Sequence, residues 1–267
     1  MTDVPDRQVH FMNHLPLLIA QLTDTHLFAN DSQEMLGCRT NQSFRAVVAD
    51  IGQLQPQPDV LLLTGDLSQD ETVESYLYLR SLIESLQIPT YWIPGNHDQR
   101  SDDMEQVLNS PFISPDKQFQ QGEWNFILLN TMMIGKVQGR LSVAELIRLE
   151  QQLQQHQQPT IAVLHHPPLP VGADCMDQIR LENSDELFEV IDRFPHVKLV
   201  LFGHIHHAFE QLRRSVRYVG TPSTCVQLKP LSEVFTIDDR SPGFRLLRLY
   251  PDGQYETEVR RVAIANV

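Results

Sequence analysis

The chain has 267 residues, of which 41% are hydrophobic, so it is long enough to bury a substantial core. Its 21 Lys and Arg residues and 34 Asp and Glu residues give a formal charge of -13 at pH 7, which argues against nonspecific binding to nucleic acid or anionic membranes. Three widely spaced cysteines without a Cys-x-x-Cys pair, and no apolar run long enough for a signal peptide or a membrane span, lead us to expect a cytoplasmic protein with reduced thiols.

The first part of the chain alternates apolar runs with amphipathic segments. After a polar lead-in over residues 1–15, continuous apolar runs predict strands buried on both faces at 17–22, 60–64 and 90–93. Apolar residues at helical spacing predict helices between them, over 41–54 and 70–86. This order is typical of an open α/β sheet, in which the chemistry lies at the carboxyl ends of the strands.

The middle of the chain follows a looser pattern of the same kind. We expect strands at 117–121, 125–130, 160–164 and 198–202, with helices over 102–109, 142–156 and 184–193. A run of glutamines between positions 151 and 158 indicates a solvated helix face and implies no chemistry.

The C-terminal part changes character. Short alternating segments separated by Gly, Pro and Asp suggest a second, mostly antiparallel sheet built from residues 208–262. There is no linker low in hydrophobicity and no internal repeat. We therefore expect residues 1–267 to form a single domain in which two sheets pack together.

Polar clusters follow five of the predicted strands. They are Asp24 and His26; Asp66; Asn96, His97 and Asp98; His165 and His166; and His204, His206 and His207. Each cluster alone is compatible with an ordinary solvated turn. Side chains at positions i and i+2 of an extended backbone face the same side, so Asp24 and His26 can point at one centre, as can His204 and His206.

Together these clusters predict a metal centre. Packing does not call for so many titratable groups on one edge of a sheet, whereas His10, His14, His156 and His196 lack such a setting and are expected on the surface or in packing. Imidazoles, carboxylates and an amide oxygen, without thiolates, suit Fe, Mn, Zn or Co. Seven candidate ligands are too many for one tetrahedral ion and suggest two ions that share a carboxylate. Such a pair of ions can bind both the attacking and the leaving oxygen of a displacement reaction at phosphorus.

The clusters resemble the five-block signature of the calcineurin-like metallophosphoesterases. The blocks are Asp24-x-His26, Gly65-Asp66, Gly95-Asn96-His97-Asp98, His165 and Gly203-His204-x-His206, in the order of that family. The resemblance implies a first metal held by Asp24, His26 and His206, a second held by Asn96, His165 and His204, and Asp66 as the bridge. The substrate would then contact His26, Asp66, Asn96, His97 and His206.

The same resemblance implies two roles in catalysis. His97 faces the phosphate and the leaving oxygen, and it would protonate that oxygen. Asp98 would orient His97 through a hydrogen bond, with a carboxylate that only caps the loop as the alternative. His166 and His207 receive no role.

Four further stretches resemble the bacterial class III cyclic-AMP phosphodiesterases: residues 23–28, 65–70, 194–198 and 221–227. This closer resemblance implies an α/β (α+β) four-layer sandwich, two mixed β-sheets flanked by helices. It also implies two divalent ions, Fe2+ or Mn2+, with Zn2+ or Co2+ as alternatives. A hydroxide held between the ions would hydrolyse 3',5'-cyclic AMP to 5'-AMP in the cytoplasm and lower cellular cyclic AMP.

Two alternatives stay open. A related metallophosphoesterase could act on a 2',3'-cyclic nucleotide, a phosphoprotein or a nucleotide-sugar pyrophosphate. A protein of the same fold could also serve as a non-catalytic binding scaffold. The expected partners are small molecules, with no nucleic acid and no membrane, and the protein is expected to be a monomer or a homodimer.

Overall fold

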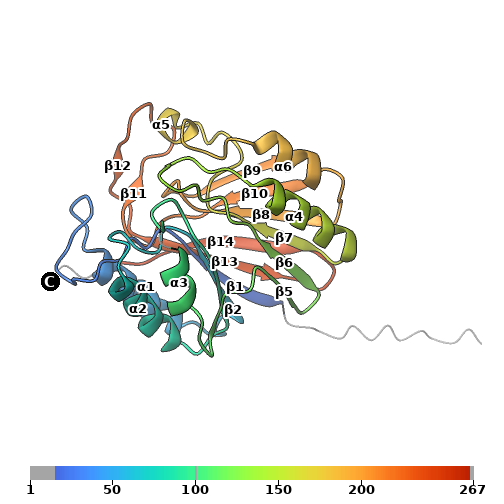
Figure 1. Cartoon of the computed structure of the whole chain (residues 1–267). Helices are drawn as coiled ribbons and strands as arrows, with labels where there is room; N and C mark the ends of the chain where they lie inside the picture. Colours follow the sequence, from blue (N-terminus) through green and yellow to red (C-terminus); the bar gives the residue numbers. More distant parts are fainter. Residues whose placement is uncertain (1–15, 100, 265–267) are drawn as a thin grey trace, which may run out of the picture.

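Two six-stranded mixed sheets flanked by helices build the protein (Figure 1). The computed structural model describes residues 16–99 and 101–264, so the expected lead-in over residues 1–15, with His10 and His14, lies outside the described residues. The helices lie on the outer faces of the two sheets, which gives four layers. The expected α/β sandwich is therefore confirmed.

The first sheet has the strand order β14-β13-β1-β2-β3-β4. Neighbouring strands pair in parallel from β1 (Leu17–Leu22) through β2 (Val60–Thr64) and β3 (Thr90–Ile93) to β4 (Ile113–Ser114). In addition, β13 (Gly243–Leu249) pairs antiparallel with β1, and β14 (Tyr255–Arg261) pairs antiparallel with β13. Its outer face is covered by α1 (Thr40–Gly52), α2 (Val73–Glu84) and α3 (Ser101–Val107).

The second sheet has the order β5-β6-β7-β8-β10-β9. Its strands are β5 (Gln118–Gln121), β6 (Trp124–Leu128), β7 (Thr160–Val163), β8 (Val197–Phe202), β9 (Phe209–Arg213) and β10 (Val216–Gly220), and only the edge strands β5 and β9 are antiparallel to their neighbours. Its outer face is covered by α4 (Val143–Gln155) and α6 (Ser184–Ile191). The short helix α5 (Asp174–Asp177) and the hairpin of β11 (Gln227–Leu228) and β12 (Ile237–Asp238) lie together at one end (Figure 1).

The expectation that residues 208–262 all belong to the second sheet is wrong. Strands β9 and β10 join the second sheet, but β13 and β14 join the first, where β13 pairs with β1. An alternating pattern predicts that a segment is a strand, but the surrounding packing decides which strand it pairs with. The strand β13 is buried along almost its whole length, because it is covered on both faces.

Three apolar layers explain why the central strands are continuous hydrophobic runs. In β2, Leu61 and Leu63 pack under the helices of the first sheet, whereas Val60 and Leu62 face the second sheet. Because successive side chains point to opposite faces, a strand between two covered faces must be apolar at every position. No helix in the described part of the chain is long and apolar enough to cross a membrane.

Candidate metal centre

Side chains from the loops after β1, β2, β3, β7 and β8 converge at one end of the two sheets. The possible ligand atoms of Asp24, His26 and His206 lie within 4.8 Å of one another, and the same holds for Asp24, Asp66 and His165. His204 belongs to a further group of this kind, with His165 and His166. The residues predicted from strand ends are thus brought together by the packing of one sheet on the other.

Left-handed backbone turns aim most of these side chains. Five residues have positive φ angles: Asp24 (52°), His26 (45°), Asp66 (51°), His204 (69°) and His206 (54°). Residues with a side chain rarely adopt this conformation, and it clusters at functional sites. The expected i, i+2 alternation therefore does not explain why these side chains point at the cluster. The extended strands end before these residues, and His204 and His206 belong to different groups of possible ligands.

Asp66 reaches both sides of the cluster. Its Oδ2 atom lies 3.8 Å from Nε2 of His26 and 3.3 Å from Nε2 of His165. Its Oδ1 atom accepts a hydrogen bond of 2.8 Å from the backbone N–H of His97. Gly95 packs directly against this carboxylate, because a Cβ atom at position 95 would lie 2.2 Å from Oδ1 of Asp66. The glycine is required by this close approach.

Hydrogen bonds fix which nitrogen of three histidines faces the cluster. Each Nδ1 atom lies 2.8 Å from an oxygen that can only accept, so Nδ1 carries a proton and Nε2 is the nitrogen that faces the cluster. The pairs are His26 with Oε1 of Gln69, His165 with the carbonyl of Thr64, and His206 with the carbonyl of Val226.

Several buried polar atoms in the cluster lack a hydrogen-bond partner among the described residues. They are Oδ1 of Asn96 and the Nε2 atoms of His165 and His204. In addition, the Nε2 atoms of His26 and His206 face each other at 3.2 Å. Buried acceptors are costly when unpaired, and these nitrogen and oxygen donors without thiolates suit borderline or hard divalent ions. The cluster is compatible with a dinuclear metal centre.

Strong electrostatic coupling accompanies this convergence. Burial opposes the ionisation of Asp66, but His165 outweighs it and holds the pKa of Asp66 well below its usual range. Burial also opposes a charge on His165, but Asp66 raises the pKa of His165 to about 9. Burial lowers the pKa of His26 to about 3. The buried carboxylate of Asp66 thus lies between an uncharged imidazole, that of His26, and a protonated one, that of His165, whose proton a metal ion would have to displace.

The expected hydrogen bond from Asp98 to His97 is absent from the part of the chain that the structure describes. The buried carboxylate of Asp98 accepts instead from the Tyr76 hydroxyl and from the backbone N–H groups of Gly95, Leu67 and Ser68. Tyr76 belongs to α2, and the three backbone donors belong to the loops after β2 and β3, so the carboxylate joins the two loops to each other and to the helix. The loop-capping alternative describes the observed contacts.

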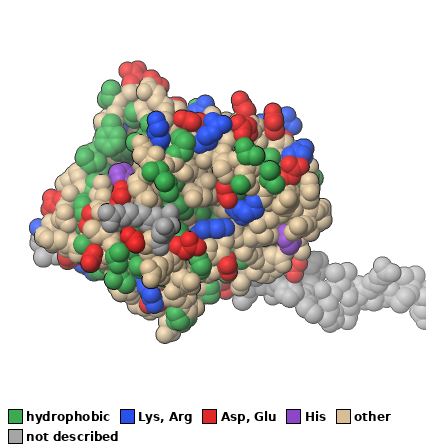
Figure 2. Space-filling view, viewed as in Figure 1, with side chains coloured by type: hydrophobic (Ala, Val, Ile, Leu, Met, Phe, Trp, Pro, Cys, Tyr) green, Lys and Arg blue, Asp and Glu red, His purple; other side chains and the backbone are tan. Residues whose placement is uncertain are grey.

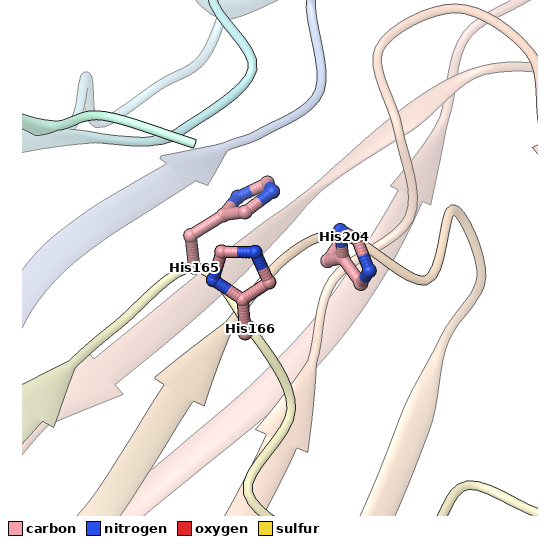
Figure 3. A group of neighbouring side chains, drawn as sticks. All are labelled: His165, His166 and His204. Carbon is pink, nitrogen blue, oxygen red and sulfur yellow. The ribbon is translucent and has the colours of Figure 1, made fainter. Parts of the chain in front are cut away.

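His166 lies beside the cluster but its nitrogens are already used. Figure 3 shows the rings of His165, His166 and His204 gathered together, and the ring of His166 lies 4.8 Å from that of His204 between centroids. Its Nε2 donates to the carbonyl of Val137 at 3.0 Å, so its Nδ1 accepts from the Thr131 hydroxyl at 2.7 Å. His166 therefore holds the loop that contains Val137. His207 is buried and belongs to none of the ligand groups found among the described residues.

Comparison with known proteins identifies the family of this site. The family model of the calcineurin-like phosphoesterases matches residues 17–208. The chain belongs to the calcineurin-like phosphoesterase family. Within that range lie all the residues that converge at the end of the sheets, from Asp24 to His206.

The chain is similar to known phosphoesterases over nearly its whole length. It is 50% identical over 249 residues to a 3',5'-cyclic-nucleotide phosphodiesterase of Nostoc sp., covering 93% of each chain. It is 41% identical over 253 residues to the 3',5'-cyclic adenosine monophosphate phosphodiesterase CpdA of Vibrio vulnificus, covering 94% of this chain and 91% of that protein. A dimetal phosphatase of Danio rerio has the same fold, with a TM-score of 0.69 and 14% identity over 92% of this chain and 96% of its own.

The structure adds supporting residues to this phosphoesterase site that sequence reasoning did not assign. Gln69 lies in a stretch that resembles the cyclic-AMP phosphodiesterases, but its contact with His26 needed the tertiary structure. The carbonyl of Val226 leaves no side-chain signal at all. Ser223, close by in sequence, donates from Oγ to the carbonyl of Asp24 at 2.7 Å. The stretch 221–227 therefore supports two of the candidate ligands, Asp24 and His206.

Proposed function

We propose that this protein is a dimetal phosphodiesterase that hydrolyses 3',5'-cyclic AMP to 5'-AMP and thereby lowers cellular cyclic AMP. The observation that carries the proposal is the set of buried polar atoms of Asn96, His165 and His204, which have no hydrogen-bond partner among the described residues and lie beside the groups of histidine and aspartate ligand atoms described above. The names of the similar proteins from Nostoc sp. and Vibrio vulnificus support the choice of substrate.

In the proposed centre, Asp66 would bridge two divalent ions. Its position between Nε2 of His26 and Nε2 of His165 supports this role. Asp24, His26 and His206 would hold the first ion, and Asn96, His165 and His204 would hold the second. We propose Fe2+ or Mn2+ as the native ions, because imidazole, carboxylate and amide donors accept both, with Zn2+ or Co2+ as alternatives.

The chain's own residues divide the work of the reaction. Two divalent ions would supply an activated water and positive charge that offsets the charge building up at phosphorus. His97 lines the cavity above the ligands, and its ring lies 4.9 Å from that of His26 between centroids. Its backbone is held by Asp66. From there His97 donates a proton to the departing ribose 3' oxygen, and it contacts the phosphate together with His26, Asp66, Asn96 and His206.

Asp98 acts in this proposal as a positioning residue. It binds the loop of Asp66 to the loop of Asn96 and His97 through amide hydrogen bonds of 2.9 to 3.1 Å. It therefore holds Asp66, Asn96 and His97 at fixed positions relative to one another, without contacting the substrate.

Product identification tests the proposed function. The protein is loaded with Fe2+, Mn2+, Zn2+ or Co2+ and incubated with 3',5'-cyclic AMP, a 2',3'-cyclic nucleotide, a phosphopeptide and a nucleotide-sugar pyrophosphate. We expect 5'-AMP from 3',5'-cyclic AMP in the fastest reaction. Turnover only of another ester would favour a related metallophosphoesterase, and failure to bind any transition metal by elemental analysis would favour a non-catalytic scaffold.

The setting of the reaction forms part of the proposal. We propose a single domain over residues 1–267 that works in the cytoplasm as a monomer or homodimer. The formal charge of -13 supports the absence of a nucleic-acid or anionic-membrane partner.

A further inference from the structure

A cavity of about 320 Å³ opens above the candidate metal centre. Its polar lining residues all belong to the floor, next to the proposed ligands: His26, Asp66, Gln69, Asn96, His97, His204 and His206. The other described residues that line it are all apolar, and we call them the apolar wall: Met35, Leu36, Val137, Met176, Ile179, Leu228 and Phe235. The cavity thus joins a charged floor to an apolar wall.

The wall is assembled from segments far apart in the sequence. Met35 follows β1, Val137 precedes α4, Met176 belongs to α5, and Leu228 and Phe235 come from the β11–β12 hairpin. Met176 and Leu228 are also part of the core, but Leu36, Val137 and Phe235, from three separate segments, are exposed by 52%, 48% and 55%. The core therefore does not account for these three apolar side chains beside one cavity. Exposed apolar surface of this kind marks a binding site.

The β11–β12 hairpin carries much of this exposed surface. Figure 2 shows hydrophobic side chains gathered at the edge where Figure 1 places β11, β12 and α5. The large exposed apolar residues of the hairpin and its turn are Leu231, Val234, Phe235 and Ile237. Among the described residues that line the cavity, Phe235 is the only Phe, Tyr or Trp.

The hairpin is held at a fixed place relative to the metal centre. The backbone N–H of Leu228 donates to the carbonyl of His206 at 3.2 Å, and Nδ1 of His206 donates to the carbonyl of Val226 at 2.8 Å. Leu228 pairs with Ile237, two residues after Phe235. The segment that orients His206, a proposed ligand, therefore leads directly into the hairpin that carries Phe235.

A cyclic nucleotide has the complementary division of chemistry. Its phosphodiester is anionic and belongs on the floor, whereas the faces of its base are apolar and its ribose connects the two. On the basis of the proposed function, we infer that the apolar wall receives the nucleobase and that Phe235 stacks on it. A cavity of this volume, with the wall facing the floor, matches a small ligand rather than a protein partner.

Weak discrimination between adenine and guanine follows from the composition of the wall. A site that hydrogen-bonds a substrate group rejects analogues that lack it by factors of about 10⁴ or more. Outside the floor, the described residues contribute no polar side chain to the lining of the cavity. Stacking tolerates any base and strengthens with the size of the ring system. We therefore expect kcat/KM for cyclic GMP within about tenfold of that for cyclic AMP, and lower values for cyclic CMP.

The test compares Phe235→Ala, Phe235→Tyr and Val234→Ala in the full-length, metal-loaded protein. Val234→Ala is the matched control, because Val234 is exposed on the same hairpin but does not line the cavity. KM and kcat are measured for 3',5'-cyclic AMP, GMP and CMP, and inhibition constants for inorganic phosphate, which has no base. We expect Phe235→Ala to raise KM for the purine substrates about tenfold, with kcat and phosphate inhibition nearly unchanged.

Each outcome bears on a distinct statement. Recovery of KM in Phe235→Tyr, with a normal Val234→Ala variant, supports stacking. An unchanged KM in Phe235→Ala, or a discrimination of more than about 10³-fold between cyclic AMP and cyclic GMP, would overturn the inference while leaving the phosphodiesterase activity in place. Failure of the unmodified protein to hydrolyse any 3',5'-cyclic nucleotide would instead refute the proposed function.

Discussion

The hydroxyl of Tyr76 in α2 donates a hydrogen bond of 3.0 Å to Oδ1 of Asp98, in the loop after β3. Both side chains are fully buried. Burial, reinforced by the negative charge of Asp66, raises the pKa of Asp98 to about 6. A helix on the outer face of the first sheet is thereby connected to the loop that holds Asn96 and His97.

Replacing Asp98 tests whether it supports the loops or the chemistry. In Asp98→Asn, the amide N–H₂ group must face N–H and O–H donors from which the carboxylate accepts hydrogen bonds. We therefore expect the free energy of unfolding to fall by about 1–3 kcal/mol. Urea unfolding of the metal-loaded protein measures this. Tyr76→Phe removes only one of these hydrogen bonds and should cost about 1 kcal/mol. Unchanged stability in Asp98→Asn, with a kcat as low as that of a His97 variant, would restore the orienting role.

Removing the proposed proton donor should separate catalysis from metal binding. We expect His97→Ala to lower kcat for cyclic AMP by about 10²- to 10⁴-fold, because the leaving oxygen then departs without a positioned acid. Metal content by elemental analysis should stay near two ions per chain, as proposed for the intact site, since His97 is not a proposed ligand. Full activity in this variant would exclude the role.

Gln69 should control metal affinity without touching the metal. Its Oε1 accepts from Nδ1 of His26, and loss of such an outer partner typically weakens metal binding by about 10- to 100-fold. We expect this loss in Gln69→Leu, measured by competition with a chelator. Gln120→Leu is the matched control, because Gln120 also contacts a histidine, His156, outside the site. Equal metal affinity in the two variants would contradict the prediction.

A single added methyl group should displace the bridging carboxylate. In Gly95→Ala the new Cβ would lie 2.2 Å from Oδ1 and 2.3 Å from the backbone N of Asp66, so one of the two loops must move. We expect loss of metal and of activity in a folded protein. In Gly52→Ala the new Cβ meets only Cδ2 of Leu86, at 3.4 Å, and this helical position should tolerate it. Retention of both ions in Gly95→Ala would argue against the tight approach.

Metal binding should strengthen as the pH rises. Burial opposes the charge of His165, but Asp66 raises its pKa to about 9, so His165 holds a proton in the metal-free protein at neutral pH. A metal at Nε2 must displace that proton, and the apparent affinity should therefore increase about tenfold per pH unit between pH 6 and pH 8.

Calorimetry in buffers of different ionisation enthalpy counts the protons released on metal binding. The sign follows from the raised pKa: the ion pair with Asp66 stabilises the metal-free fold below the usual pKa of histidine and is lost as the pH rises through about 9. Affinity that does not change with pH would show that His165 is already deprotonated.

The sequence by itself determined the longer strands and pointed to the candidate site residues. Continuous apolar runs such as 17–22 and 60–64 specify strands covered on both faces, and β1 and β2 have those bounds. The polar residues that follow them could be found because a turn at a strand end has no packing reason to carry Asp66, His165 or His204. Very short elements such as β4 and α5 carry too few residues for a pattern, and they were missed.

Only the tertiary structure decided how these parts meet. The pairing of β13 with β1 depends on which sheet edge is open, which no alternation of residues records. The tautomers of His26 and His206 depend on Gln69 and on the carbonyl of Val226, which are distant in sequence. The contacts of Asp98 followed the nearest backbone N–H groups rather than His97. The type of a side chain determines which interactions it can make, whereas the distances across the fold determine which partner it makes them with.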